Sequence, residues 1–252
     1  MVKQDYWDAS YESAVFSIAP KDSIIRRWIE AHVGDGKGSC IEVGAFPGTY
    51  LSVFGELGYE LNGIDLSPGV EEDLPNWLKE KGYKVGRFYR DDFLGFKSNV
   101  RYQIVCSFGF VEHFSDWENI LVMHSELVDK GGLLVVSAPN FRGIIQRSIH
   151  LLLNRENYRR HNIKSMRPER WRKILESKGF RTRFCGHFGG FHFWVDSVER
   201  NFFQKAALKT LVALTPFLKR IITRNSSAYS PHCGIVMIRE SEPGRRPTAL
   251  AG

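Results

Sequence analysis

The sequence lacks several features that would place it in other classes of protein. Its four cysteines (Cys40, Cys106, Cys185 and Cys233) lie far apart, and their spacing fits neither a zinc site nor a disulfide framework. No uninterrupted apolar run reaches the roughly 18–20 residues that a membrane-spanning helix needs. The first residues, MVKQDYWDASYE, lack the charged-then-apolar layout of a secretory signal. We therefore expect free, buried thiols and a cytoplasmic protein.

What the sequence does have is many apolar residues and an uneven distribution of charge. Hydrophobic residues make up 43% and aromatic residues 13% of the 252 positions, which excludes a disordered chain. The formal net charge is +7, yet residues 1–140 carry 13 basic and 21 acidic side chains, whereas residues 141–252 carry 22 and 7. The two parts of the chain are therefore expected to recognise different things.

Residues 39–137 alternate short apolar runs with amphipathic segments, which is typical of a parallel α/β sheet. The predicted strands cover residues 40–43, 61–64, 85–89, 102–106 and 133–137. The predicted helices cover residues 23–33, a segment from Pro47 through Leu57, residues 69–81, and residues 117–128, the last ending in Lys130-Gly131-Gly132.

The chain changes character after Pro139. The patterns there predict helices over residues 142–153, 168–177 and 198–222, a polar connector over 155–167, and strands over 181–188 and 234–239. Pro216 is expected to break or kink the last helix. Together these elements predict an α/β fold: a Rossmann-like, doubly wound, mostly parallel seven-stranded sheet with helices on both faces and helical elaborations after the fifth strand.

Acidic residues stand at the ends of three successive predicted strands. Glu42 ends the first strand and precedes a turn through Gly44 and Gly48, where the backbone can pass close to a ligand. Asp65 closes the second strand 23 residues later, where a carboxylate can accept both hydroxyls of a ribose. The third, in Arg90-Asp-Asp-Phe93, suits the donor-rich edge of adenine beside an apolar side chain. Each is common as a turn or cap, but the three in order indicate a nucleotide site.

These segments resemble the motifs of class I S-adenosylmethionine-dependent methyltransferases. Glu42-Val-Gly-Ala-Phe-Pro-Gly48 resembles the first motif, Gly63-Ile-Asp65 the second and Asp92-Phe93 the third. Tyr102-Gln-Ile-Val-Cys-Ser-Phe-Gly-Phe-Val-Glu-His-Phe114 looks like the fourth, and Gly131-Gly-Leu-Leu-Val-Val-Ser137 like the fifth. The resemblance covers about residues 20–140 and implies a methyltransferase with S-adenosylmethionine as cofactor and S-adenosylhomocysteine as product. A Rossmann NAD enzyme is not favoured, because its G-x-G-x-x-G run is missing.

The resemblance also implies which residues hold the cofactor. The two motif glycines would approach the methionine part of the cofactor, and Asp65 would hold its ribose. The third motif would contact the adenine, and the end of the fourth strand would line the floor of the site. The implied set is Glu42, Gly44, Phe46, Gly48, Asp65, Leu66, Asp92, Phe93, Ser107, Phe108 and Gly109. Phe46-Pro47 replaces the middle glycine often found in the first motif, which stiffens the loop and lets Phe46 pack on the ligand. This variant resembles methyltransferases of bacterial surface-polysaccharide (O-antigen or capsule) gene clusters.

The sequence offers few candidate bases. Methyl transfer from a sulfonium requires positioning of the nucleophile and, for a hydroxyl, removal of a proton. His113, just beyond the fourth predicted strand, is one candidate, although it could instead hydrogen-bond the loop or the cofactor. The adjacent Glu112 is expected to act as a cap. We predict no metal, because Phe108-Gly109-Phe110 lacks the further carboxylate with which some quinone-pathway members of the family bind one.

An aromatic segment, residues 184–194, provides the other candidates. It would leave the sixth strand through a glycine-rich turn and present His187, His192 and several rings, either as a stacking platform for the acceptor with a reserve base or as ordinary core packing. At the N-terminus, Tyr6-Trp7-Asp8 resembles the family's lid segment, to which Tyr11 could add.

Three kinds of partner could explain the basic second part of the chain. Nucleic acid is not favoured, since no RNA-binding motif is present. An anionic or phosphate-linked small molecule or glycan acceptor needs only a few Arg and Lys side chains. A membrane surface could use residues 142–153 and 198–222, whose basic and apolar faces match interfacial helices.

We therefore expect an O-methyltransferase that acts on a sugar of a bacterial glycan or of its phosphate-linked precursor, in the cytoplasm or at the inner face of the membrane. The alternatives are methylation of a small aromatic or quinone-type lipid, and a binding protein that has lost catalysis. The expected organisation is an N-terminal lid and helical segment (1–38), the cofactor-binding core (39–140), the basic acceptor side of the same domain (141–240) and a disordered tail (241–252).

Overall fold

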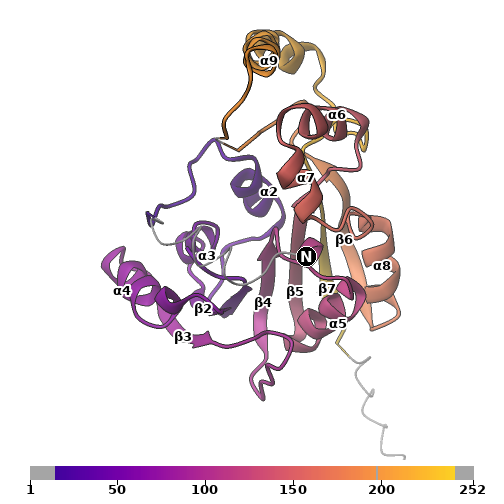
Figure 1. The fold of residues 1–252 in the computed structure, drawn as a ribbon. Coiled ribbons are helices and arrows are strands. Elements are labelled where there is room, and N and C mark those ends of the chain that lie inside the picture. The colour runs from indigo at the N-terminus through magenta and orange to yellow at the C-terminus, as the bar shows by residue number, and fades with distance from the viewer. Residues whose placement is uncertain (1–14, 197, 242–252) are drawn as a thin grey trace, which may run out of the picture.

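A computed structural model of the chain describes residues 15–196 and 198–241. Its centre is one seven-stranded sheet in the order β3-β2-β1-β4-β5-β7-β6 (Figure 1). The strands are β1 Ser39–Val43, β2 Glu60–Asp65, β3 Val85–Arg90, β4 Tyr102–Phe108, β5 Val128–Pro139, β6 Phe180–Phe188 and β7 His232–Arg239. All neighbours pair in parallel except that β7 runs antiparallel to both β5 and β6. The predicted α/β architecture is confirmed.

Helices cover both faces of this sheet. The elements are α2 Ile24–His32, α3 Leu51–Glu56, η1 Pro68–Val70, α4 Asp73–Glu80, η2 Val111–His113, α5 Trp117–Leu127, α6 Ile144–Leu153, α7 Arg155–Arg160, α8 Pro168–Glu176 and α9 Phe202–Ile221. One buried cluster joins the sheet to α2, α3 and α4, and a second joins its other face to α5 and α8. The apolar runs of the strands therefore serve two core layers at once, which is why they show little alternation.

Three sequence predictions are corrected by the structure. The segment 155–167, expected to be a polar connector, begins with the helix α7. Its Asn157 is buried and donates a hydrogen bond to Asp196, so a polar sequence still has a fixed tertiary partner. Gly131 and Gly132 lie within β5 and do not end the preceding helix, because β5 already begins at Val128.

The third correction concerns Pro216, which lies inside α9: the helix is not broken there, whereas the alternative of a kink stays a prediction. A proline in a helix leaves the carbonyl four residues earlier without its N–H partner. That carbonyl belongs to Val212, whose 55% exposure allows water to replace the missing donor. The exposed position of the helix therefore explains why it continues.

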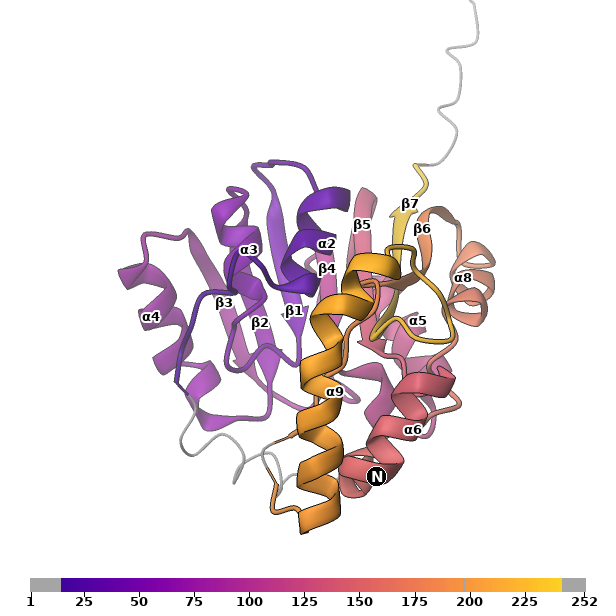
Figure 2. The same cartoon turned by 90° about the horizontal axis from the view of Figure 1, so that it is seen from above.

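Helix α9 lies outside the two main core layers. Figure 2 shows α9 beside α6. Its inner stripe packs on Ile149 and Leu153 of α6 through Ala207, Leu208 and Leu211. None of its residues is buried. Among the described residues, no helix is long and apolar enough to cross a membrane.

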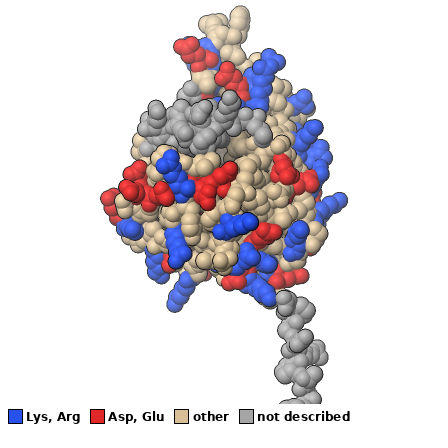
Figure 3. Space-filling model, turned by 60° about the horizontal axis from the view of Figure 1, so that its bottom comes forward, with Lys and Arg blue, Asp and Glu red and all other residues tan. Residues whose placement is uncertain are grey.

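The uneven charge of the sequence is also uneven in space. Figure 3 shows acidic side chains gathered mainly on the side of the molecule where α4 and β3 lie, and Lys and Arg side chains along the side of α8 and β6. The thiols carry no disulfide within the described chain: Cys40, Cys106 and Cys233 are buried as expected, whereas Cys185 is half-buried.

Candidate active site

A cavity of about 560 Å³ opens at the carboxyl ends of β1, β2 and β4. It is lined by the turn after β1, by residues that follow β2 and β3, and by the segment from Phe108 to Phe114. In open α/β sheets, ligands bind outside the carboxyl ends of the strands where the strand order reverses, and here β1 and β4 are those neighbours. The volume lies within the usual range for a small-molecule site.

The turn after β1 lines one side of this cavity, and two of its glycines set its shape. Gly44 and Gly48 have φ angles of 73° and 81°, a left-handed conformation that glycine adopts without strain. The N–H groups of Gly44 and Ala45 donate to the carbonyl of Ile64, at 2.9 and 3.2 Å, and so tie the turn to β2. The turn therefore holds a fixed shape against a ligand.

Asp65, at the end of β2, lies next to this turn. Its Oδ2 accepts the N–H of Phe46 at 3.1 Å and its Oδ1 accepts the N–H of Ser67 at 2.8 Å. A carboxylate oxygen can accept more than one hydrogen bond, which suits this side chain to the hydroxyl groups of a ligand. Phe46 itself is 8% exposed and lines the cavity, and its packing on a ligand stays a prediction.

Glu42 lies deeper. It is 4% exposed and lines the cavity, and its Oε2 has no hydrogen-bond partner among the described residues. Burial, and then the nearby Asp65 carboxylate, raise the pKa of Glu42 well above its ordinary value. A buried acceptor without a partner is costly, and a cationic donor from a ligand would relieve both effects.

The third acidic strand end forms the outer rim. Asp92 accepts the N–H of Leu94 at 3.0 Å through Oδ1, and it lines the cavity together with Leu66, which is 41% exposed. Phe93 is buried with its ring edge-on to Phe110, the centroids 5.9 Å apart. An acidic group beside an apolar side chain is thus in place.

At the end of β4 the structure brings only part of the predicted floor together. Phe108 and Gly109 line the cavity, whereas Ser107 is fully buried within β4 and is not among the lining residues. Sequence reasoning missed Tyr50, Phe110 and Phe114, which line the cavity as well. The signal for them was weak: Tyr50 follows the first motif, and Phe110 and Phe114 stand in the fourth motif as aromatic residues with no assigned role.

Glu112, His113 and His161 form a cluster beside the cavity. One ligand atom of each lies within 4.8 Å of the others. Burial, and then the neighbouring His161, lower the pKa of His113, a cavity residue, to about 3. Burial raises the pKa of Glu112 to about 8, and neither carboxylate oxygen has a hydrogen-bond partner among the described residues, so the expected cap is not formed. The absence of a metal stays a prediction.

A smaller cavity of about 280 Å³ adjoins the first, with Tyr50 lining both. The start of α2 forms one side and the segment after β6, with His192 and Trp194, forms the other. His192 Nδ1 and Trp194 Nε1 are buried and have no hydrogen-bond partner among the described residues. Two buried polar ring atoms thus lie in residues that line the smaller cavity.

The other half of the aromatic segment packs in the core. Phe188 stacks on Trp28 with ring centroids 4.4 Å apart, and Phe184 meets the same ring edge-on at 5.6 Å. His187 lines a third cavity, away from the first two. Part of the segment thus packs in the core and part lines cavities, while its role as a platform for the acceptor stays a prediction. The suggested lid residues, Tyr6-Trp7-Asp8 and Tyr11, lie outside the described residues, as does the tail from residue 242.

The sheet order and the cavity define a Rossmann-like enzyme with a nucleotide-type ligand site. The chain belongs to the methyltransferase domain family, whose family model matches residues 20–183. It is an S-adenosylmethionine-dependent methyltransferase, and S-adenosylmethionine is its cofactor. No curated protein matches the chain in sequence.

Solved structures share the fold at low sequence identity. A candidate methyltransferase of Bacillus halodurans has a TM-score of 0.57 at 15% identity, covering 85% of this chain and 98% of that one. An S-adenosylmethionine-dependent methyltransferase of Archaeoglobus fulgidus gives 0.53 at 18%, with 85% and 92% covered. Magnesium protoporphyrin IX methyltransferase of Synechocystis with bound S-adenosylhomocysteine gives 0.53 at 14%, with 94% of both chains covered.

Proposed function

We propose that S-adenosylmethionine binds in the cavity of about 560 Å³ and that the acids at its strand ends orient it. Glu42 accepts the ammonium group of the methionine part and Asp65 the ribose hydroxyls. Asp92 faces the adenine amino group, and Phe93 and Leu66 pack on its ring. The backbone at Gly44 and Gly48 and at Phe108-Gly109 completes the cradle, with Phe46 over the ligand. The single observation that supports this most is the buried Glu42 Oε2, which has no hydrogen-bond partner among the residues that the structure describes.

When bound, the cofactor supplies an electrophilic methyl group on a cationic sulfur that departs as a neutral thioether. The chain must therefore position the acceptor and remove its proton. We place the acceptor in the smaller cavity, because Tyr50 lines both cavities. Orienting the acceptor in line is worth up to about 7–11 kcal/mol in favourable cases.

His192 is the histidine best placed to remove that proton. It lines the acceptor cavity and its Nδ1 has no described partner, while burial and the nearby Lys219 lower its pKa below the ordinary value, which keeps the ring neutral and able to accept. His113, with a pKa of about 3, is too weak a base and serves as a neutral wall of the cofactor cavity. His187 lies at the third cavity and takes no part.

The proposed reaction is O-methylation of a sugar hydroxyl in a bacterial glycan or its phosphate-linked precursor. A sugar presents hydroxyls to polar ring atoms and an apolar face to an aromatic ring, and His192, Trp194 and Tyr50 offer both in a cavity of about 280 Å³. Polar groups at the start of α2, Asp22 and Ser23, also line it. A wholly apolar slot would favour a quinone-type lipid instead, and the lining is not of that kind. The Phe46-Pro47 turn further supports the polysaccharide branch.

The proposed location is the cytoplasm, with peripheral contact to the inner membrane face through α6 and α9. The outward side of α9 exposes Phe202 and Phe203, at 79% and 81%, and Phe217 at 62%. Leu152 of α6, 56% exposed, lies next to them, since the Gln204 side chain donates to its carbonyl at 2.8 Å. Lysines of the same helix flank these side chains, as in helices that lie in a membrane interface.

Methyl transfer from labelled S-adenosylmethionine tests the function. Acceptors should be offered as free sugars, nucleotide-linked sugars and lipid-linked glycans, with quinone-type lipids as the competing class. Transfer to a sugar hydroxyl, lost in a His192→Gln variant that still binds S-adenosylhomocysteine, is the expected result. Transfer to the quinone-type lipid alone contradicts the sugar assignment.

Sedimentation with vesicles tests the membrane contact separately. The wild-type protein should sediment with anionic vesicles and less with neutral ones, and a Phe202→Ser, Phe203→Ser variant should lose most of this binding. Equal sedimentation of that variant and the wild type would show that α9 does not contact the bilayer.

A further inference from the structure

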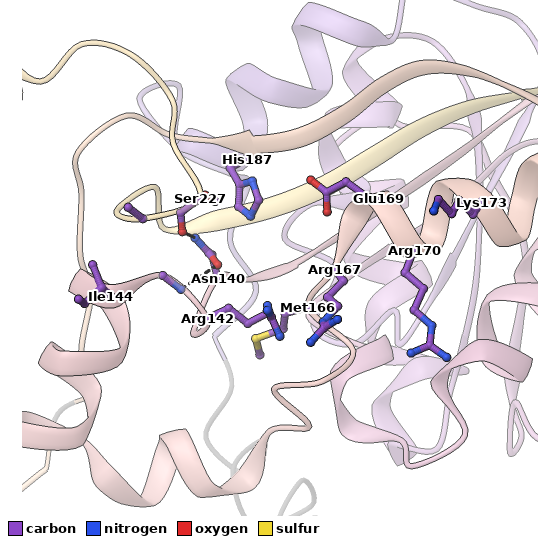
Figure 4. Close-up of a pocket in the computed structure, with 12 residues that line it drawn as sticks. Asn140, Arg142, Ile144, Met166, Arg167, Glu169, Arg170, Lys173, His187 and Ser227 are labelled. Carbon is purple, nitrogen blue, oxygen red and sulfur yellow. Dashed lines mark hydrogen bonds between the residues drawn. The ribbon is translucent and has the colours of Figure 1, made fainter.

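A third cavity, of about 770 Å³, lies at the same edge of the sheet but beside α8 (Figure 4). It is formed by the segment after β5, the start of α6, the start of α8, the end of β6 and the loop before β7. It shares no lining residue with the two cavities assigned to cofactor and acceptor. Neither assignment therefore explains it.

Buried side chains separate this cavity from the cofactor. Met166, 1% exposed, lines the third cavity, and its sulfur contacts the backbone N–H of Phe141 at 3.3 Å. The Phe141 ring meets His161, and His161 meets His113, with centroids 4.9 and 4.8 Å apart. Because His113 lines the cofactor cavity, at least this layer of rings stands between the two spaces.

Basic side chains dominate the lining. Arg142, Arg167, Arg170 and Lys173 line the cavity against a single carboxylate, Glu169. Arg170 pairs with Glu118. In the part of the chain that the structure describes, the other three basic side chains form no ion pair within 4.0 Å, and Figure 4 shows Arg142 and Arg167 extending toward one another from two walls.

Two helix starts add to this positive surface. Gly143 caps α6 and Arg167 caps α8, both line the cavity, and neither helix receives a side-chain cap. The helices have ten and nine residues, so the positive ends of both dipoles face the same space. Burial lowers the pKa of His187, and the charges of Glu169 and Arg142, which line the same cavity, act on this pKa in opposite directions.

We propose that this cavity binds a pyrophosphate-bearing small molecule. A single phosphate would leave most of 770 Å³ empty, whereas a diphosphate can engage Arg142 from one wall and Arg167 and Lys173 from the other. Ile144, 67% exposed in the lining, gives the remainder of the ligand an apolar contact. Glu169 points toward His187, as Figure 4 shows, which leaves the arginine side of the cavity to the anion. The site goes beyond the proposed function and does not depend on it.

Titration calorimetry with inorganic pyrophosphate, on the full chain saturated with S-adenosylhomocysteine, tests the site. The wild type should bind, and an Arg142→Gln, Arg167→Gln variant should bind at least about tenfold more weakly, because two charge-assisted contacts are lost. The control variant Arg155→Gln, Arg181→Gln removes the same charge from exposed positions outside the cavity and should bind as the wild type does. Affinity for S-adenosylhomocysteine should be unchanged in both variants, so failure here is distinct from failure of the cofactor assignment.

Two competitors identify the source of the diphosphate. Uridine diphosphate represents a nucleotide and farnesyl diphosphate a prenyl lipid, and displacement of pyrophosphate by either supports the site and names the class. Equal pyrophosphate affinity of the two double variants would overturn the proposal. So would pyrophosphate binding that disappears when S-adenosylhomocysteine is added, since that result would place the anion in the cofactor cavity.

Discussion

Replacing Asp65 with alanine should weaken the binding of S-adenosylhomocysteine strongly. The carboxylate already accepts two backbone N–H groups, from Phe46 and Ser67, and these hold it at the cavity wall. In the proposed complex it also accepts two ribose hydroxyls. Hydrogen bonds to a charged group contribute about 1.5–3 kcal/mol each, so losing both, partly compensated by water, should cost about 2–4 kcal/mol. That cost corresponds to a loss of affinity of roughly 30- to 1,000-fold.

Titration calorimetry measures this loss directly, without an acceptor. Asp65→Asn keeps one carbonyl acceptor and should fall between the alanine variant and the wild type. Asp129→Ala is the matched control, because this exposed aspartate lies at the opposite end of the sheet, near the start of β5, where it accepts the N–H of Lys130. The control should bind as the wild type does.

Asp65→Ala should also lower the stability of the ligand-free protein, and this effect must be separated from the loss of affinity. Two backbone donors at the turn lose their acceptor, which should lower the free energy of unfolding by about 1–3 kcal/mol. Thermal unfolding of the ligand-free proteins measures that part. An Asp65→Ala protein that is folded and binds S-adenosylhomocysteine within threefold of the wild type would refute the ribose assignment.

Three further variants test other parts of the site. Gly48→Ala places a Cβ against a side chain of α4, at a φ of 81°, and should reduce the affinity for S-adenosylhomocysteine at least about tenfold. The control Gly82→Ala, at a φ of 82° with open space around it, should cost only about 1–2 kcal/mol of stability. Equal affinities of the two variants for S-adenosylhomocysteine in calorimetry would contradict the proposed role of the Gly48 backbone. The pKa of Glu112 is near 4.5 in the unfolded chain, whereas burial raises it to about 8 in the folded protein. Between these two pH values the folded protein holds a proton that the unfolded chain has released, so the free energy of unfolding falls as the pH rises from 4.5 to 8, by at most about 5 kcal/mol. Glu112→Gln should therefore unfold at a higher temperature than the wild type at pH 8 and show less advantage at pH 5, and an unchanged difference would show that the carboxyl is not protonated in the native state. His192→Gln should lower the rate of methyl transfer about 100-fold with unchanged cofactor affinity, while His187→Gln should not, and similar rates in both would remove His192 as the base.

The fold could be predicted from the sequence because each strand is an apolar run bounded by turn residues. The strand ends Glu42 and Asp65 were predicted on the same grounds, since the carboxyl ends of neighbouring parallel strands meet at one edge of the sheet. Helix α7 could not be predicted in this way. Its sequence, RENYRR, has no apolar stripe, and tertiary contacts such as that between Asn157 and Asp196 fix it instead.

The division of the histidines among three cavities also lay beyond the sequence. His187 and His192 are five residues apart in one glycine-rich segment, yet they line different cavities because the chain leaves the sheet between them at Gly189 and Gly190. Tyr50 illustrates the same point: it follows the first motif, and nothing in that motif shows that this residue lies beside the start of α2. Which side chains come to line the same cavity at the edge of the sheet is set by tertiary packing, and no local sequence pattern predicts it.

The way α9 is attached bears on how proteins of this kind change over evolutionary time. The helix packs through one stripe on α6 and contributes nothing to the two core layers of the sheet. The family model ends at residue 183, before this helix begins. No residue of α9 lines the cofactor cavity either, so we expect substitutions and insertions along this helix to affect the sheet and its cofactor site little. The outer surface of the molecule can therefore vary while the sheet and its cofactor site are kept.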